Sequence, residues 1–181
     1  MTSPADRATL LRIARDAVGA HIAVAPPLPV DRGAVVDRCA GVFVSIHRRG
    51  DLRGCIGHIA ADTRLGDVIV QCAVSACSAD PRFPPITRSE LTEIDIELSI
   101  LGPLEPITGP EDIEIGRHGL LVEREHRRGL LLPQVATEWK WDAVTFLAQT
   151  CRKAGLPVNA WKQGARLWRF EAEVFGETLL T

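Results

Sequence analysis

One short stretch, Leu52 to Gly57, combines a thiol, a guanidinium and two glycines in a segment that its apolar residues predict to be a strand. Glycine weakens a strand and often marks a close approach of a ligand or another backbone, so Gly54 and Gly57 are candidate substrate-binding residues. Arg53 and Cys55 are predicted to share one strand face, where the guanidinium would favour the nucleophilic thiolate. The alternative is that Cys55 is a small buried apolar residue, as free cysteines often are.

Two further titratable residues lie in segments with strand character. Glu97 occupies the polar side of the alternating segment 93–100. If that side is buried, the carboxylate requires a cationic partner, for which Arg53 and Arg82 are the candidates. His118 stands at the start of a later strand and is a candidate general base, because histidine titrates near neutral pH. A turn histidine that bonds to the backbone is the alternative.

A stiff loop and a strand end supply the remaining candidates. In the segment 80–85, Asp80 is predicted to cap the turn while Arg82 holds a carboxylate or a phosphate. The alternative is a simple helix stop, packed by Phe83. Gln134 follows a proline at the end of an apolar strand and presents its amide as a further substrate-binding group.

The cysteine pattern predicts reduced thiols and no metal site. Five cysteines form no regular framework, which favours a reducing cytoplasm over disulfides. Cys55 and His58 are three apart and point to opposite faces of a strand, and Cys72 and Cys77 are a poor chelating pair on a helix. No tetrahedral zinc is therefore expected, although a mixed site of Cys55 with the distant His118 stays open. The cofactor is not identified.

The bulk composition describes a soluble globular protein. The chain has 181 residues, 46% of them apolar, with a net charge of −2 and a pI near 6.2. Nothing in that balance draws it to nucleic acid or to anionic lipid, no apolar run is long enough to cross a bilayer, and charged residues interrupt any leader at the N-terminus. We expect one cytoplasmic domain over residues 1–181.

The hydrophobic patterns predict helices and antiparallel strands. Helices are expected over residues 3–22, 63–79 and 138–154, and strands over 41–47, 52–59, 93–100 and 168–174, with a second hairpin before Gln134. The first hairpin turns at Arg49-Gly50, which pairs Val44 with Cys55 and Ile46 with Arg53. Both faces of that hairpin are mixed, so the strand of Cys55 is expected inside the sheet. The fold class is α+β, a mainly antiparallel sheet with flanking helices.

Collinear motifs give the chain a family resemblance. The segments GVFVSI, LRGCIG, DPRFPP, ELSIL, HGLLV, GLLLPQVA and CRKAG follow one another within residues 9–176. In this respect the chain resembles the AMMECR-domain family, of the type called protein A of the AmmeMemoRadiSam system. The resemblance implies a larger lobe, a smaller lobe and a cleft near the cysteine motif. It also implies a Memo-like protein and a radical-SAM protein as partners, but it supplies no reaction.

Two functions follow. In the first, an enzyme acts on a small molecule or a modified protein: Cys55 is the nucleophile, Arg53 supports its charge, His118 moves protons, and Glu97 or Asp80 orients the basic groups. In the second, a non-catalytic binding or scaffold module holds the Memo-like partner in the same cleft. The sequence identifies neither the substrate nor the oligomeric state.

Overall fold

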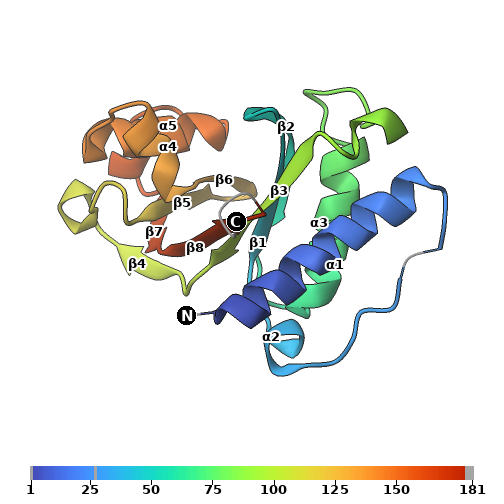
Figure 1. The fold of residues 1–181 in the computed structure, drawn as a ribbon. Helices are drawn as coiled ribbons and strands as arrows, with labels where there is room; N and C mark the ends of the chain where they lie inside the picture. The colour runs from blue at the N-terminus through green and yellow to red at the C-terminus, as the bar shows by residue number, and fades with distance from the viewer. Residues whose placement is uncertain (1, 27, 178–181) are drawn as a thin grey trace. The chain divides into compact units, whose positions relative to one another are not determined.

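The computed structural model describes residues 2–26 and 28–177 (Figure 1). These residues form two compact units: unit 1 lies within residues 1–101 and 173–181, and unit 2 spans residues 102–172. Each unit contains a four-stranded sheet and helices. The α+β class with a larger and a smaller lobe is therefore confirmed, while a single domain over residues 1–181 stays a prediction.

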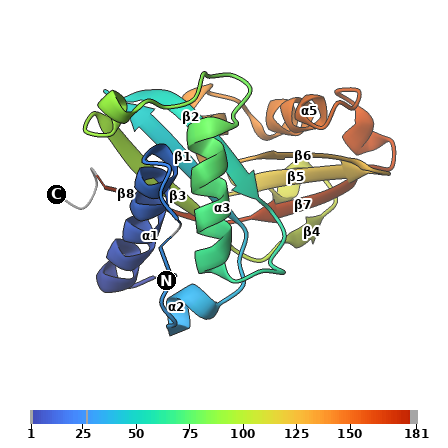
Figure 2. The ribbon, with the colours of Figure 1, turned by 90° about the vertical axis from the view of Figure 1, so that its right-hand side faces the viewer.

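Unit 1 places two helices on one side of its sheet, as Figures 1 and 2 both show. The strand order is β2-β1-β3-β8, and β1 runs antiparallel to both β2 and β3. The elements are α1 (Pro4–Ile22), α2 (Ala34–Asp37), β1 (Val42–Arg48), β2 (Asp51–His58), α3 (Leu65–Ser78), the 3-10 turn η1 (Arg88–Glu90), β3 (Ile94–Leu101) and β8 (Ala172–Gly176).

The long N-terminal helix begins where its capping residues predict. The Ser3 side chain accepts a hydrogen bond from the backbone of Asp6, and the Asp6 side chain accepts one from the backbone of Ser3. This reciprocal arrangement satisfies backbone donors that the first helical turn cannot pair internally. The helix then packs along α3 and β3, and it helps to cover the apolar side of the sheet.

The core of unit 1 lies between the helices and one face of the sheet. On β1 and β3, every second residue is apolar and buried in this core: Val42, Val44, Ile46, Ile94, Ile96, Leu98 and Ile100. Helical residues such as Leu10, Ala14, Val68 and Ile69 pack against them. The residues between them along the strands, including Ser45, Glu97 and Ser99, therefore project from the other face of the sheet.

The first hairpin turns where it was predicted, but its register differs by one residue. Arg49 and Gly50 have positive φ angles of 53° and 89°, as a two-residue hairpin turn requires. His47 pairs with Leu52 but Ile46 pairs with Gly54, so Arg53 is an extra residue in a β-bulge. The predicted pairing of Val44 with Cys55 is wrong, because the bulge shifts the register and brings Ser45 opposite Cys55.

The strand that carries Cys55 is an edge strand, so its predicted place inside the sheet is wrong. β2 stands at one end of the strand order and pairs with β1. Its mixed polarity has a different cause. The segment that follows α3 covers the free edge and supplies hydrogen-bond partners there, as described below.

Unit 2 has the sheet order β4-β7-β5-β6. Two predicted elements were each too long. The helix expected over 138–154 begins only after Asp142, whose side chain caps it at the Thr145 amide. Glu138 ends an earlier helix, and Lys140 between the two has a positive φ of 54°. The final strand is likewise divided at Glu171. The elements are β4 (Glu105–Ile107), η2 (Pro110–Asp112), β5 (Gly119–Arg124), β6 (Arg127–Leu131), α4 (Pro133–Glu138), α5 (Ala143–Lys153), η3 (Ala160–Lys162) and β7 (Arg166–Phe170).

Within the described ranges, none of the helices combines the length and the apolar character that crossing a membrane requires.

Candidate functional site

The peptide groups of Cys55 are held on the free edge of β2 by the segment after α3. The Asp80 carboxylate accepts the Cys55 amide N–H at 2.9 Å, and Arg82 Nη2 donates to the Cys55 carbonyl at 3.3 Å. In the antiparallel ladder these groups point away from β1, so an edge that would otherwise be unpaired is closed at this residue. We call Asp80 and Arg82 the edge clamp.

The edge clamp is built around a buried carboxylate. The Asp80 side chain is 2% exposed and accepts hydrogen bonds from the Arg82 backbone, from Arg82 Nε at 3.0 Å and from Arg82 Nη2 at 2.7 Å. The Arg82 hydrogen bonds, joined by that of the Cys55 amide, hold the pKa of Asp80 well below its usual range. Asp80 therefore stays ionised, and it fixes both the backbone of Cys55 and the guanidinium beside it.

The thiol of Cys55 belongs to a row of polar side chains that crosses three strands. Ser45 is opposite Cys55 on β1, and Glu97 is opposite Ser45 on β3. The Ser45 hydroxyl donates a hydrogen bond to Cys55 Sγ at 3.2 Å. These residues alternate with the apolar core residues, so the row lies on the face of the sheet away from α1 and α3.

The environment keeps this thiol neutral at rest. Burial raises the pKa of Cys55, and the negative charges of Asp80 and Glu97 act in the same direction. The Ser45 hydrogen bond and the positive charge of Arg82 lower the pKa but do not outweigh burial. The arrangement therefore holds a half-buried thiol between groups that stabilise its anion and groups that oppose it.

Arg53 is not the guanidinium that acts on Cys55. Its Nε donates to Glu90 at 2.9 Å, and its other nitrogens bond to Glu90 and to the carbonyls of Pro84 and Pro85. The Arg53 hydrogen bond lowers the pKa of Glu90 to about 2, with help from the Thr87 amide. The group predicted to support the thiolate is thus engaged elsewhere, and Arg82 stands in its place.

The two glycines of the motif each have a packing reason. A Cβ on Gly54 would lie 2.1 Å from the carbonyl oxygen of Ala76, so Gly54 lets α3 approach β2 on the core side. A Cβ on Gly57 would lie 2.3 Å from the Phe43 ring, on the same face as the polar row. Their assignment to substrate binding stays a prediction.

Two of the predicted site residues belong to unit 2. His118 is buried, and its Nδ1 accepts the backbone N–H of Glu114 at 2.9 Å. Burial and then the charges of Arg169 and Arg117 lower the pKa of His118. The histidine is therefore neutral and bonded to backbone, as in the alternative stated for it. Gln134 lies in the first turn of α4.

The described cysteines, histidines and acidic residues were also compared with the requirements of a metal site. Across residues 2–26 and 28–177, no group of three or more His, Cys, Asp or Glu side chains is placed to hold a metal ion. The five cysteines are free: Cys72, Cys77 and Cys151 are buried, Cys39 is exposed, and Cys55 is between these extremes. Burial raises the pKa of Cys72 to about 11.

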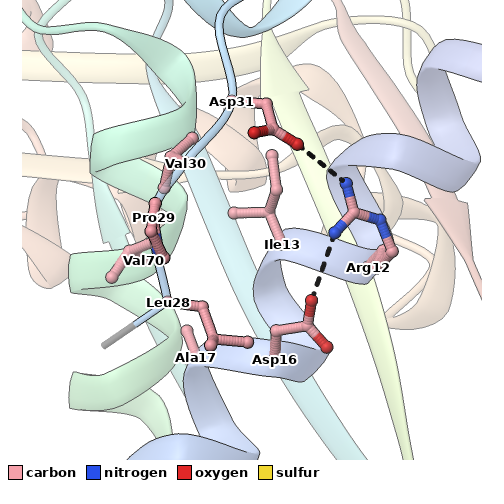
Figure 3. A pocket seen from close by; sticks show the side chains of 9 residues that line it. All are labelled: Arg12, Ile13, Asp16, Ala17, Leu28, Pro29, Val30, Asp31 and Val70. Atoms are coloured by element: carbon pink, nitrogen blue, oxygen red, sulfur yellow. Dashed lines mark hydrogen bonds and ion pairs between the residues drawn. The ribbon is translucent and has the colours of Figure 1, made fainter. Parts of the chain in front are cut away.

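Unit 1 also contains a pocket on the helix side of its sheet (Figure 3). It measures about 260 Å³ and lies between α1, the connector around Pro29 and Val70 of α3. Most of its lining is apolar, and its charged residues pair with one another, Arg12 with Asp16 and with Asp31. The described residues that line the pocket include no cysteine, serine or histidine, so the polar row is the stronger candidate for chemistry.

Sequence reasoning missed Ser45. Its partnership with Cys55 depends on the bulge at Arg53, and no local residue pattern announces that bulge. An available signal was the strand alternation of β1 itself, which puts Ser45 on the face opposite Val44 and Ile46. Because β3 places Glu97 on the same face, the polar row follows once the register is known.

Comparisons with known proteins agree with this fold. A family model described as AMMECR1 matches residues 11–175. A protein of Methanothermobacter thermautotrophicus is 46% identical over 178 residues, which is 93% of each chain. A protein of Methanosarcina barkeri is 49% identical over 142 residues, 76% of this chain and 70% of that one. The crystal structure of an uncharacterised protein from Pyrococcus horikoshii is similar with a TM-score of 0.87 at 38% identity, covering 93% of this chain and 89% of that chain.

Proposed function

We propose that this chain, which belongs to the AMMECR1 family, is a cysteine-dependent enzyme that acts on a small molecule or on a modified protein. One observation carries the proposal: a buried, ionised Asp80 and the guanidinium of Arg82 hold both peptide groups of Cys55. A cysteine that only fills space does not need this arrangement. Preorganised surroundings of this kind are typical of a reactive group whose position matters.

The other residues of the polar row, Ser45 and Glu97, also influence the thiol in this proposal. Ser45 donates to Sγ, which stabilises the sulfur as negative charge develops on it. Glu97 lies one strand further along the row, and its negative charge opposes formation of the thiolate at rest. The thiol is neutral at rest because burial raises its pKa, so in this proposal the thiolate forms when a substrate is bound.

Thiol alkylation tests this proposal directly. We expect native Cys55 to react with iodoacetamide faster than the core residues Cys72, Cys77 and Cys151, with a rate that rises as pH increases, as measured by mass spectrometry of each peptide. We also expect Cys55→Ser to keep the thermal unfolding midpoint and to abolish the cellular phenotype of the gene. The matched control is Cys72→Ser, which should lower the midpoint because it buries a hydroxyl in the core. An unreactive Cys55 together with a destabilised Cys55→Ser would refute the nucleophile.

A specific observation favours a second function. The pKa of Cys55 is raised, not lowered, as befits a residue that packs and does not react. In that case the chain is a non-catalytic binding or scaffold module. Normal complementation by Cys55→Ser in a strain that lacks the gene would favour this function over the enzyme.

The partners follow from the resemblance and the location from the cysteine pattern, and both are proposals. We propose that the chain works with a Memo-like protein and a radical-SAM protein, in the cytoplasm. Five free cysteines are consistent with a reducing compartment. Titration of the purified chain with the Memo-like protein of the same organism, followed by calorimetry, tests the first partner, and absence of a binding heat at micromolar concentrations would count against it.

A further inference from the structure

The guanidinium beside Cys55 belongs to Arg82, which makes its contacts through the Nε and Nη2 atoms. Arg82 uses Nε and Nη2 on Asp80, and Nη2 also reaches the Cys55 carbonyl. In the described part of the chain, none of the hydrogen bonds of Arg82 involves Nη1, and the side chain is 52% exposed. Asp80, in contrast, is 2% exposed, so the pair presents a donor to the outside and keeps its acceptor inside.

This donor is held beside Cys55. Arg82 Nη2 donates to the Cys55 carbonyl at 3.3 Å, and the positive charge of Arg82 lowers the pKa of the Cys55 thiol. Its two bonds to Asp80 restrain the plane of the guanidinium, and its centre lies 5.4 Å from the centroid of the Phe83 ring. Arginine held in this way loses little conformational freedom when it binds an anion.

Charged residues of opposite sign lie on the two sides of Cys55. Arg82 reaches Cys55 from the free edge of β2, whereas Glu97 lies on the other side of Ser45, on β3. A ligand that spans the sulfur therefore meets a cation at one end and a carboxylate at the other. Arg82 supplies one positive charge, which it already shares with Asp80, so a monoanion suits the row better than a dianion.

We propose that Arg82 forms an anion-binding subsite beside Cys55, and that the substrate is a small monoanion whose carboxylate binds Arg82 Nη1 and whose electrophilic carbonyl carbon faces Sγ. This inference rests on the proposed function and names its substrate class. Edge-clamp residues hold the subsite, and the end of the substrate nearer Glu97 carries a neutral group or a hydrogen-bond donor.

The reaction step is an addition. The sulfur forms a bond to the carbonyl carbon while the carbonyl π bond breaks and its electron pair moves to oxygen. The proton that leaves the thiol ends on that oxygen, so the product is a hemithioacetal or hemithioketal. No oxidant, reductant or second reactant is consumed.

A matched pair of alkylating reagents tests the subsite. Iodoacetate is a monoanion and iodoacetamide is its neutral analogue of nearly the same size. We expect the ratio of their rates at Cys55 to exceed the ratio for N-acetylcysteine by about tenfold at low ionic strength, as expected for a charge-assisted hydrogen bond. The excess should fall as salt is added. A Cys55 ratio equal to that of N-acetylcysteine would overturn the subsite.

Variants assign the effect to Arg82. Arg82→Gln should remove the excess, and Arg82→Lys, which keeps a charge for Asp80, should retain part of it and guard against loss of fold. The control is Arg49→Gln, which removes one positive charge from the exposed turn of the hairpin that carries Cys55. It should leave the ratio of the iodoacetate and iodoacetamide rates unchanged. An equal fall in Arg49→Gln would show that net charge alone is responsible.

A second measurement separates the two proposals. Oxamate, a monoanion with an amide donor, should raise the thermal unfolding midpoint of the wild-type chain, and neutral oxamide should not. The increase should be absent in Arg82→Gln. If Cys55 reacts with neither alkylating reagent while oxamate still stabilises the wild-type chain, the nucleophile is refuted and the subsite stands. If oxamate and oxamide act alike, the subsite is refuted whatever the reactivity of Cys55.

Discussion

The two faces of the unit 1 sheet are organised by different interactions. On the face covered by α1 and α3, valine, isoleucine and leucine side chains alternate without interruption along β1 and β3, and Gly54 lets a helix approach a strand closely. On the other face, Ser45, Glu97 and Ser99 lie beside the Cys55 thiol, with the Phe43 ring packed at Gly57. Close packing of apolar side chains organises the first face, while hydrogen bonds and charges organise the second.

The covered face contributes stability, whereas the proposed function is assigned to the polar face. An apolar face needs no further explanation, because burial of such side chains stabilises a fold. Polar groups on a partly or fully buried face are costly unless each has a partner. Ser45 is bonded to Cys55, whereas the Ser99 hydroxyl is buried and lacks a hydrogen-bond partner within the described ranges. The function proposed for Cys55 would give this face a reason to stay polar.

The largest expected effect comes from breaking the covered face. In Gly54→Ala the new Cβ would meet the Ala76 carbonyl at 2.1 Å, and neither backbone can move without shifting α3. We expect a loss of about 3 kcal/mol or more in the free energy of unfolding, the upper range for an overpacked core. Urea denaturation measures it.

Gly19→Ala is the control for this change. Gly19 lies within α1 and has no atom within 4 Å of an added Cβ, so alanine there should be neutral or slightly stabilising. A Gly54→Ala variant as stable as the wild type would mean that the close approach of α3 is not what this glycine provides.

The two faces also differ in how well the sequence predicts them. Strand alternation could be predicted, but the contacts of the polar face could not. The alternation of residues 93–100 predicted both the strand and the outward position of Glu97, since side-chain direction depends only on a period of two. The capped helix at Ser3 also followed from local chemistry. The bulge at Arg53 did not, because it depends on how β2 is held against its neighbours. With the register shifted, Ser45 could not be paired with Cys55, and Arg53 was assigned the role that Arg82 has the geometry to play.

An effect of intermediate size concerns the charge that holds Arg53. Glu90 is buried and its pKa is lowered from 4.5 to about 2, first by the Arg53 hydrogen bond. A lowered carboxyl pKa contributes stability that is complete above the unfolded value and is lost as pH falls toward the folded value. We expect Glu90→Gln to cost on the order of 2 kcal/mol at pH 7.

The pH dependence distinguishes this effect from simple packing. The difference in unfolding free energy between wild type and Glu90→Gln should shrink as pH is lowered from about 4.5 to about 2. As a control, Glu105→Gln removes an exposed partner of Arg169 and should cost under about 0.5 kcal/mol. A Glu90→Gln cost that is constant down to pH 2 would show that charge is not what Glu90 contributes.

The smallest expected effect on stability, with the clearest effect on chemistry, is at Ser45. Ser45→Ala removes the hydroxyl that donates to Cys55 Sγ at 3.2 Å. Because that hydrogen bond lowers the pKa of Cys55, its loss should raise the pKa further and slow iodoacetamide alkylation several-fold at a fixed pH near neutrality. The unfolding free energy should change by less than about 1 kcal/mol.

Ser99→Ala is the matched control on the same face, because the Ser99 hydroxyl lacks a hydrogen-bond partner in the residues described. This variant should be at least as stable as the wild type and should leave the alkylation rate of Cys55 unchanged. If both variants slow alkylation equally, the Ser45 hydrogen bond has no specific part in setting the thiol pKa, and the polar face acts on Cys55 only through its general polarity.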